Sequence, residues 1–341
     1  MKRFFKRLGL GLLALIVILV VVYMLGPTPD APTLAPEFPK VNTTLANLDQ
    51  YVADKEKKIA DLRPDNESRV IWADPAKKEQ TEYAIVYLHG FSASWMEGAP
   101  VHTQFAKKYG CNMYLPRLAG HGIGIQDAFL KLTEDELYNS AKEAIVIGQK
   151  LGKKVIVMAT STGGLLGLHI AANHPEIEAL ILYSPLIRLF DPSTKLLDKP
   201  WGLQVARLAI GDKYYDFTKE SDKPRRQYWT TRYRLEGTVM LQNLVMNSMK
   251  EETFKKVKQP VFMGYYYKDE ANQDKTVSVA AMKEMFEQLG TPADKKRKVA
   301  FPKAGAHVIA SKLTSKAYKR VFAETDKFAQ EVLGLKPVLR K

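Results

Sequence analysis

Among the patterns in this sequence, residues 154–171 restrict the fold most, because they encode a short buried strand that passes through a tight corner into an apolar helix. Val155–Met158 is a β-branched and apolar run, typical of a strand covered on both faces. Ser161 lies at the corner, with small residues two positions before and after it, Ala159 and Gly163. Such a corner strains the serine and exposes its hydroxyl, and only small neighbours fit. Ser161 is therefore either a nucleophile or an ordinary N-cap of the helix.

Length and composition fit a globular protein with one large core. The 341 residues suffice for one α/β domain with an insertion or for two smaller domains. The single cysteine, Cys111, excludes an intrachain disulfide and a cysteine metal cluster, and the spacing of the six histidines suggests no metal site. The net charge of +14 comes from lysines and arginines that are spread among acids, with no basic stripe. We therefore expect no metal or other cofactor and no nucleic-acid partner.

The N-terminus combines a basic segment with a long apolar run. Residues 1–7 contain lysines and arginines, whereas residues 8–25 carry no charge. As a helix, this run spans about 27 Å, close to the hydrocarbon thickness of a bilayer. A cleavable signal peptide is the alternative, but its apolar region is normally about 7 to 15 residues long and ends in a small-residue cleavage site. We predict an uncleaved single-pass membrane anchor.

The charges around this anchor also predict its orientation. No lysine or arginine occurs from residue 8 to Pro39, so the positive-inside rule places the N-terminus in the cytoplasm and the remaining chain outside it. Five prolines between residues 26 and 39 indicate an extended linker. The predicted segments are a basic segment (1–7), an anchor (8–25), a linker (26–40), a first core part (41–185), a cap (186–256) and a second core part (257–341).

Strand and helix patterns alternate after the linker. We expect strands at 69–72, 83–88, 112–115, 155–158, 179–183, 260–267 and 298–301, and helices at 45–62, 99–109, 133–152, 279–289 and 314–333. This alternation implies βαβ crossovers and a mainly parallel, doubly wound sheet, with residues 69–72 near an edge. The alternation stops over about 186–256, where the sequence predicts helices at 201–210 and 233–249 but no convincing buried strand. That segment is interpreted as an inserted helical cap.

A serine nucleophile needs a histidine to take its proton and a carboxylate to orient that histidine. His307 follows the last predicted strand, and its small neighbours Gly305 and Ala306 would let it approach the sheet. In a doubly wound sheet, the loops after parallel strands meet at one edge, where Ser161 also emerges. The carboxylate should come from the loop after the preceding strand, which offers both Asp269 and Asp274.

The order of serine, aspartate and histidine, with a His89–Gly90 turn upstream, resembles the α/β-hydrolase fold. Within that fold, the chain is similar to the capped serine hydrolases of the monoacylglycerol lipase, lysophospholipase and carboxylesterase type. The resemblance covers roughly residues 69–334 and is weakest across the cap. It implies an oxyanion hole formed by the backbone amides of Phe91 and Thr162.

The resemblance also favours one aspartate over the other. The family's acid is commonly followed three residues later by valine and then by proline or serine, which matches Asp274 with Val277 and Ser278. We therefore predict the triad Ser161, Asp274 and His307, with Asp269 as the alternative acid. Two positions depart from the family pattern, since Ala159 replaces the usual glycine and Thr160 a common histidine.

The expected function is hydrolysis of a carboxylic ester through an acyl-enzyme on Ser161, with His307 as the base. The tether and an apolar cap favour a lipid or monoglyceride as the substrate. Peptidase or acyltransferase chemistry with the same triad, and a non-catalytic binding protein with this fold, are the alternatives.

Other polar and aromatic residues have two interpretations each. Glu97 and His102 flank the start of the helix at 99–109 and either line a pocket or cap that helix, whereas His89 is expected to brace the oxyanion turn. Aromatic residues near the turn and in the cap either form an apolar acyl pocket or simply pack; they include Trp95, Trp201, Tyr214 and Tyr215.

Overall fold

The computed structural model describes residues 1–338, in which seven strands form one sheet in the order β1-β3-β2-β4-β5-β8-β9. The strands are β1 (Arg69–Ile71), β2 (Thr81–Leu88), β3 (Asn112–Leu115), β4 (Gly152–Thr160), β5 (Ile177–Tyr183), β8 (Val261–Tyr265) and β9 (Lys296–Ala300). The edge strand β1 runs antiparallel to β3, and the other pairings in this sheet are parallel. The predicted mainly parallel sheet, with its first strand at an edge, is therefore confirmed.

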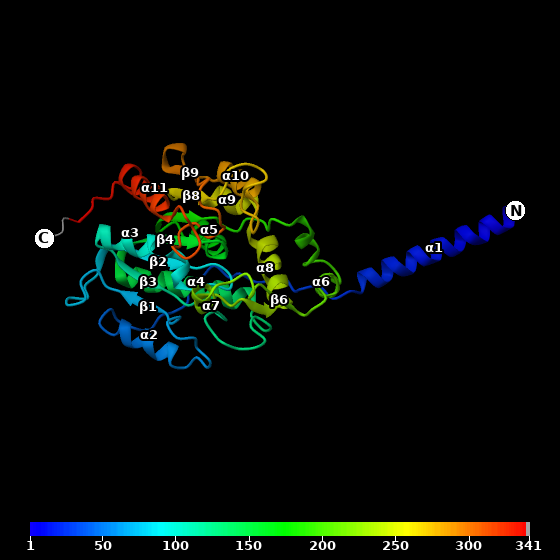
Figure 1. The fold of residues 1–341 in the computed structure, drawn as a ribbon, viewed down its shortest axis with the longest axis horizontal. Helices are drawn as coiled ribbons and strands as arrows, with labels where there is room; N and C mark the ends of the chain where they lie inside the picture. Colours follow the sequence, from blue (N-terminus) through cyan, green and yellow to red (C-terminus); the bar gives the residue numbers. More distant parts are fainter. Residues whose placement is uncertain (339–341) are drawn as a thin grey trace.

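Helices cover both faces of this sheet (Figure 1). The helices of the described residues are α1 (Lys2–Met24), α2 (Leu48–Glu56), α3 (Val101–Tyr109), α4 (Glu134–Leu151), α5 (Thr162–Asn173), α6 (Gly202–Ile210), α7 (Lys223–Tyr228), α8 (Leu235–Ser248), α9 (Glu251–Lys256), α10 (Val279–Gln288) and α11 (Tyr318–Glu331), with short 3₁₀ turns η1 (Trp95–Gly98), η2 (Pro192–Leu196) and η3 (Ala293–Lys295). Helices α3 and α11 pack on one face, whereas α4, α5 and α10 pack on the other.

The central strands have almost continuously apolar sequences because both of their faces are buried. Along β4, Val155, Val157 and Ala159 face the core under α4 and α5, while Ile156 and Met158 face the core under α3 and α11. Side chains alternate between the two faces of a strand, and both faces are covered here. The same arrangement places the carboxyl ends of β2, β4, β5, β8 and β9 along one edge.

Two helix boundaries differ from the sequence predictions. Helix α2 ends at Glu56 rather than Leu62, and α11 begins at Tyr318 rather than Thr314. Before α11, the amides of Lys312 and Lys316 donate to the carbonyls of Ala99 and Ala304 instead of forming a helical turn. Tertiary hydrogen bonds thus replace helical ones where the sequence pattern alone favoured a helix.

The segment between β5 and β8 is largely helical, as predicted, and also contains a strand pair that was not expected. Strands β6 (Tyr214–Asp216) and β7 (Arg232–Arg234) run antiparallel. With three residues each, these strands are too short to show an alternating pattern in the sequence. The guanidinium of Arg232 on β7 lies 3.5 Å from the ring centroid of Tyr214 on β6, a cation–π contact between the two strands. Helix α8 packs into the main core through Met240 and Leu244, which joins this cap to the sheet domain.

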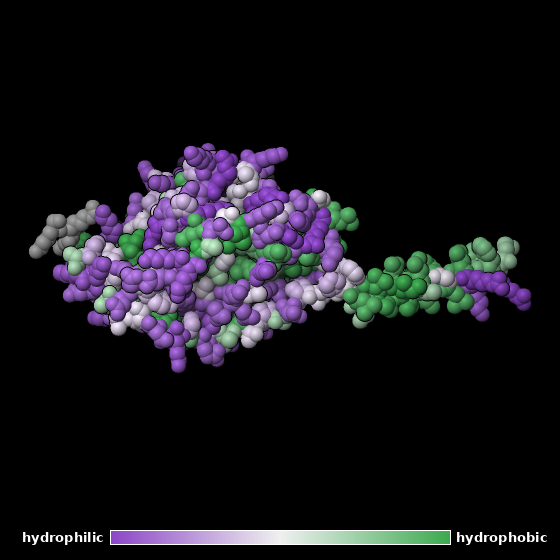
Figure 2. All heavy atoms as spheres, turned by 90° about the horizontal axis from the view of Figure 1, so that it is seen from below, coloured by the Kyte–Doolittle hydropathy of each residue, from purple (hydrophilic) through white to green (hydrophobic). Residues whose placement is uncertain are grey.

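Helix α1 extends away from the rest of the molecule, with its apolar side chains exposed (Figure 2). Residues Arg3–Met24 form a candidate membrane span by length and composition. The helix also includes the basic residues that precede the apolar run.

The proline-rich segment that follows α1 has no helix or strand, and its second half lies against the core. Lys142 of α4 donates to the carbonyls of Ala35 and Glu37, and Leu34 is buried. Near α1, the indole of Trp201 donates to the carbonyl of Val22 at 2.9 Å. The cap therefore contacts the end of α1 directly.

Candidate active site

Ser161 occupies a strained corner between β4 and α5, with φ 53° and ψ −118°. A positive φ is rare for a residue with a side chain, and such strain persists only where the surroundings enforce it. Its amide donates to the carbonyl of Tyr183, while its own carbonyl accepts from the amides of Gly164 and Leu186. Its side chain forms no N-cap hydrogen bond with α5. The geometry therefore argues against an ordinary N-cap, while the role of Ser161 as a nucleophile stays a prediction.

The glycines around Ser161 are required by close backbone approach. A Cβ on Gly163 would lie 2.0 Å from the carbonyl oxygen of Leu88, so no larger residue fits between α5 and β2. A Cβ on Gly90 would lie 3.0 Å from Cβ of Ser161, which places the His89–Gly90 turn directly against the serine. Ala159 is completely buried, and its methyl group is accommodated where the family usually has glycine.

The structure brings Asp274, and not Asp269, to His307. Oδ2 of Asp274 accepts a hydrogen bond from Nδ1 of His307 at 2.6 Å, and Oδ1 accepts from the amides of Thr276 and Val277 at 2.8 and 3.1 Å. Asp274 is buried. Asp269 is exposed and accepts hydrogen bonds within its own loop, from the amide of Asn272 at 2.8 Å among others.

His307 is held close to the serine corner. The hydroxyl of Ser184 donates to the carbonyl of His307 at 2.8 Å, and the preceding residue, Tyr183, accepts from the amide of Ser161. Burial alone would lower the pKa of His307, but the charge and hydrogen bond of Asp274 outweigh it and raise that pKa above its usual value. Among residues 1–338, no hydrogen bond joins the hydroxyl of Ser161 to His307, a contact that often tightens only with substrate bound.

The amides of Phe91 and Thr162 lie on opposite sides of the corner, after the His89–Gly90 turn and at the first residue of α5. Neither amide donates to an acceptor within the described part of the chain. Amides in the first turn of a helix have no partner within the helix and carry the positive end of its dipole. Both donors are therefore available to a developing negative charge near Ser161, although their role in an oxyanion hole stays a prediction.

Glu97, which the sequence assigned either to a pocket lining or to a helix cap, contacts the His89–Gly90 turn. It is buried, and Oε2 accepts from the amide of Gly90 at 2.6 Å and from the hydroxyl of Tyr87 at 3.3 Å. Burial raises the pKa of Glu97 to about 7. The interpretation of Glu97 as a helix cap is wrong, because the N-cap of α3 is Pro100. No local pattern reveals this role, since it depends on a turn seven residues upstream.

The buried histidines near the turn serve as neutral hydrogen-bonding groups. Nδ1 of His89 donates to the carbonyl of Gly90, and Nε2 accepts from the amide of Leu118 at 3.1 Å, as expected for a brace. Nε2 of His102 bonds the carbonyl of Trp95 at 2.8 Å. Burial lowers the pKa of both histidines to about 4, so neither is charged near neutrality.

The aromatic residues proposed for an acyl pocket have separate structural partners. The indole of Trp95 donates to the carbonyl of Asp65 at 2.7 Å, while Trp201 contacts the end of α1. The hydroxyl of Tyr214 donates to Asp127, and Tyr215 is exposed. The packing interpretation therefore fits these four side chains better than a shared pocket.

Comparison with known proteins supports the same fold. A thermostable monoacylglycerol lipase from a Bacillus species is 28% identical over 109 residues, covering 32% of this chain and 43% of that protein. A 2-succinyl-6-hydroxy-2,4-cyclohexadiene-1-carboxylate synthase from Salmonella paratyphi B is 32% identical over 146 residues, covering 40% of this chain and 54% of that protein. The chain thus spans about half the length of these relatives.

Solved structures share the architecture at low identity. A structure of the metagenome-derived lipolytic enzymes LipS and LipT has a TM-score of 0.59 at 16% identity, covering 79% of this chain and 99% of that one. The monoacylglycerol lipase of Paleococcus ferrophilus has a TM-score of 0.54 at 15% identity, covering 77% and 98%. Residues 85–316 match the alpha/beta hydrolase family, more than half of the chain. The protein therefore belongs to the alpha/beta hydrolase family.

Proposed function

We propose that this protein is a membrane-anchored serine hydrolase that cleaves carboxylic esters through an acyl-enzyme on Ser161. The observation that carries the proposal is the buried Asp274–His307 pair, joined at 2.6 Å beside the strained corner of Ser161. A serine is activated in this way when a histidine can accept its proton and a carboxylate fixes the ring.

In the proposed reaction, the hydroxyl of Ser161 attacks the ester carbonyl while Nε2 of His307 takes its proton. The charge of Asp274 stabilises the resulting imidazolium through Nδ1. The amides of Phe91 and Thr162 would donate to the oxyanion, an effect of roughly 3 kcal/mol for each donor. His307 then protonates the departing alcohol and activates the water that hydrolyses the acyl-enzyme.

Several features favour a lipid or monoglyceride as the substrate. One relative with partial coverage is a monoacylglycerol lipase. Helix α6 directly follows Trp201, the cap residue that contacts α1. The cap has exposed apolar side chains on α6 and just before it, namely Leu196, Val205, Leu208 and Ile210. With α1 in a bilayer and the catalytic domain outside the cytoplasm, this apolar face would lie near the membrane surface, where such substrates are found.

Labelling with a fluorophosphonate probe tests the proposal. Wild-type protein should become covalently labelled, and the Ser161→Ala variant should not, because the probe reacts with an activated serine. Equal labelling of the two proteins, or none of the wild type, would contradict the proposal. Turnover of matched esters and amides by the unlabelled wild-type protein would then separate esterase from peptidase chemistry.

A further inference from the structure

Arg225, on the cap helix α7, has a guanidinium group without a hydrogen-bonding partner among the described residues. Among residues 1–338, none of its side-chain nitrogens forms a hydrogen bond or an ion pair, and Nε is shielded from solvent. The guanidinium lies over two aromatic rings, with its central carbon 5.4 Å from the centroid of Phe217 and 6.0 Å from that of Trp229. A shielded cation without a counter-ion is costly, and aromatic contacts repay only part of this cost.

Other arginines of the same cap do have partners. Arg207 pairs with Glu236 at 2.6 Å, and Arg226 donates to the carbonyl of Ser221 at 2.6 Å. Arg234 is bound by both Asp127 and Glu236. The cap therefore contains carboxylates that could neutralise an arginine, yet none of them reaches Arg225 within the described residues.

Arg225 lies near enough to the candidate active site for its charge to act on Glu97 and His307. Helix α7 packs against η1, the turn that carries Glu97. Burial raises the pKa of Glu97, and the charges of His307 and Arg225 act against that rise. The charge of Arg225 likewise opposes the raised pKa of His307. Trp229, whose ring lies next to the guanidinium, packs in one cluster with Ala93 and Val308. Ala93 closely follows the His89–Gly90 turn, and Val308 is the neighbour of His307.

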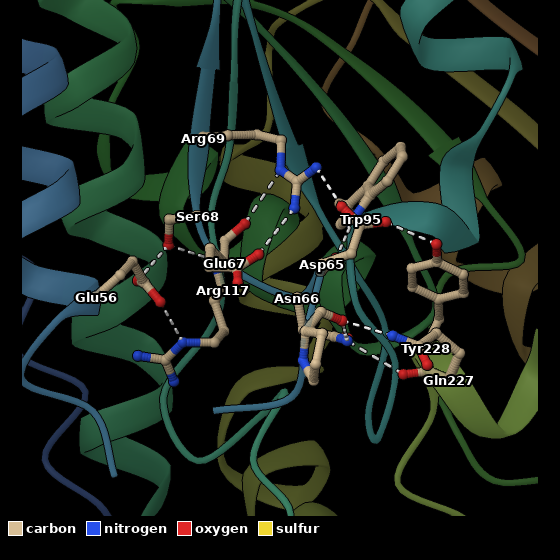
Figure 3. A network of polar contacts seen from close by, with 11 residues as sticks. Glu56, Asp65, Asn66, Glu67, Ser68, Arg69, Trp95, Arg117, Gln227 and Tyr228 are labelled. Atoms are coloured by element: carbon tan, nitrogen blue, oxygen red, sulfur yellow. Dashed lines mark hydrogen bonds and ion pairs between the residues drawn. The ribbon is translucent and has the colours of Figure 1, made fainter. Parts of the chain in front are cut away.

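The end of α7 is held rigidly by hydrogen bonds to the segment before β1 (Figure 3). The hydroxyl of Tyr228 donates to Asp65 at 2.6 Å, and the side-chain amide of Asn66 donates to the carbonyl of Gln227 at 3.1 Å. The amide of Thr230 donates to the carbonyl of Ser92 at 2.7 Å, next to the oxyanion turn. A guanidinium on such a fixed support is preorganised for a ligand.

We propose that Arg225 binds an anionic group of the substrate, a carboxylate or a phosphate, and that the enzyme selects esters carrying such a group near the scissile bond. The inference rests on the proposed esterase activity of Ser161. Guanidinium groups match carboxylate and phosphate oxygens with paired hydrogen bonds, which strengthen where water is excluded. An anionic substrate would therefore supply the hydrogen-bonded partner that Arg225 lacks among the described residues.

Two 4-nitrophenyl esters with four-carbon acyl chains give a matched test, the neutral butyrate and the anionic hemisuccinate. In Arg225→Gln, the ratio of kcat/KM for hemisuccinate to that for butyrate should fall at least tenfold, with most of the loss in KM. Arg225→Lys should fall between this variant and wild type. Lys223→Gln, which removes an exposed charge from the same helix, should change the ratio less than twofold. Equal losses for both esters in Arg225→Gln would exclude a carboxylate on the acyl side as the group that Arg225 binds.

A second pair of substrates distinguishes the two anionic groups. For 1-butanoylglycerol and its 3-phosphate, the same ratio falls in Arg225→Gln if the residue reads a phosphate on the alcohol side. A fall confined to one pair identifies the group and its side of the ester, and no fall in either pair rejects the inference. Fluorophosphonate labelling of Arg225→Gln at the wild-type rate shows that the variant retains its fold and its serine.

Binding to the inactive enzyme separates this inference from the proposed function. Calorimetry with monobutyl succinate, or with 1-butanoylglycerol 3-phosphate if the ratio falls only in the second pair, should show at least tenfold weaker binding to Ser161→Ala/Arg225→Gln than to Ser161→Ala. If that difference is found but wild type hydrolyses no ester, the proposed function fails and the anion site stands. If esters are hydrolysed but the two variants bind alike, the anion site fails alone.

Discussion

The sheet edge and the outer cap differ in whether key side chains are buried and have partners within the described residues. At the sheet edge, Asp274 is buried and accepts three hydrogen bonds, from His307 and from two backbone amides. On the cap, Leu208 is 85% exposed, and Arg225 has no partner among the described residues. The Asp274–His307 pair at the edge is complete without a ligand, whereas the cap offers apolar and cationic groups that a ligand or a membrane could satisfy.

This difference suggests a division of roles. The edge supplies a fixed reaction geometry that is independent of what the substrate carries, since its groups contact one another. The cap supplies the contacts that would choose among substrates, since Arg225 and the exposed apolar side chains of α6 have no partners among the described residues. Changes at the edge should therefore affect all esters alike, while changes on the cap should affect some esters or some physical forms of the substrate.

The largest effect should come from the triad acid. Asp274→Asn removes the negative charge that orients and stabilises His307, so kcat for a short aryl ester should fall about 10³- to 10⁴-fold. Asp269→Asn is the matched control and should stay within about twofold of wild type, because Asp269 is exposed and bonds only its own loop. A collapse in Asp269→Asn with an active Asp274→Asn would reverse the assignment.

The same contrast explains what the sequence could predict. The apolar run before Ser161 and the small residues around it report the backbone constraints of the corner, so the sheet and its edge were recognisable. Asp274 was preferred over Asp269 through a family pattern, and the structure gives a physical counterpart, since the amide of Val277 donates to Asp274. These features depend on short stretches of sequence.

Glu97 and Arg225 could not be found in this way. Glu97 accepts a hydrogen bond from Gly90 across a turn, and the proposed role of Arg225 depends on α7, which is fastened to residues far away in sequence, such as Asp65. Helix α7 is only six residues long, too short for a hydrophobic period to show. The cap is built from such short elements, so the residues it contributes to the site emerge only from tertiary contacts.

An intermediate effect is expected for Glu97 in the pH dependence of stability. Burial raises its pKa from 4.5 to about 7, so the folded protein retains a proton that the unfolded chain releases. The free energy of unfolding should therefore fall as the pH rises from about 4.5 to 7, by about 3 kcal/mol at most, and then level off. Glu97→Gln should remove this decline, as chemical denaturation at several pH values would reveal. An identical decline in the variant would assign it to other groups.

The smallest effect should come from the cap surface, and it should depend on the physical form of the substrate. If the apolar face of α6 rests on the bilayer, Leu208→Glu should slow hydrolysis of monooleoylglycerol in vesicles about fivefold, since burial of one leucine contributes roughly 1 to 2 kcal/mol. Turnover of a soluble aryl ester should not change. Val338→Glu introduces the same charge at an exposed apolar position near the C-terminus, at the end of the molecule opposite α1, and should affect neither substrate (Figure 1). Equal slowing of both substrates in Leu208→Glu would mean that the leucine supports the active site, and the division between edge and cap would then break down.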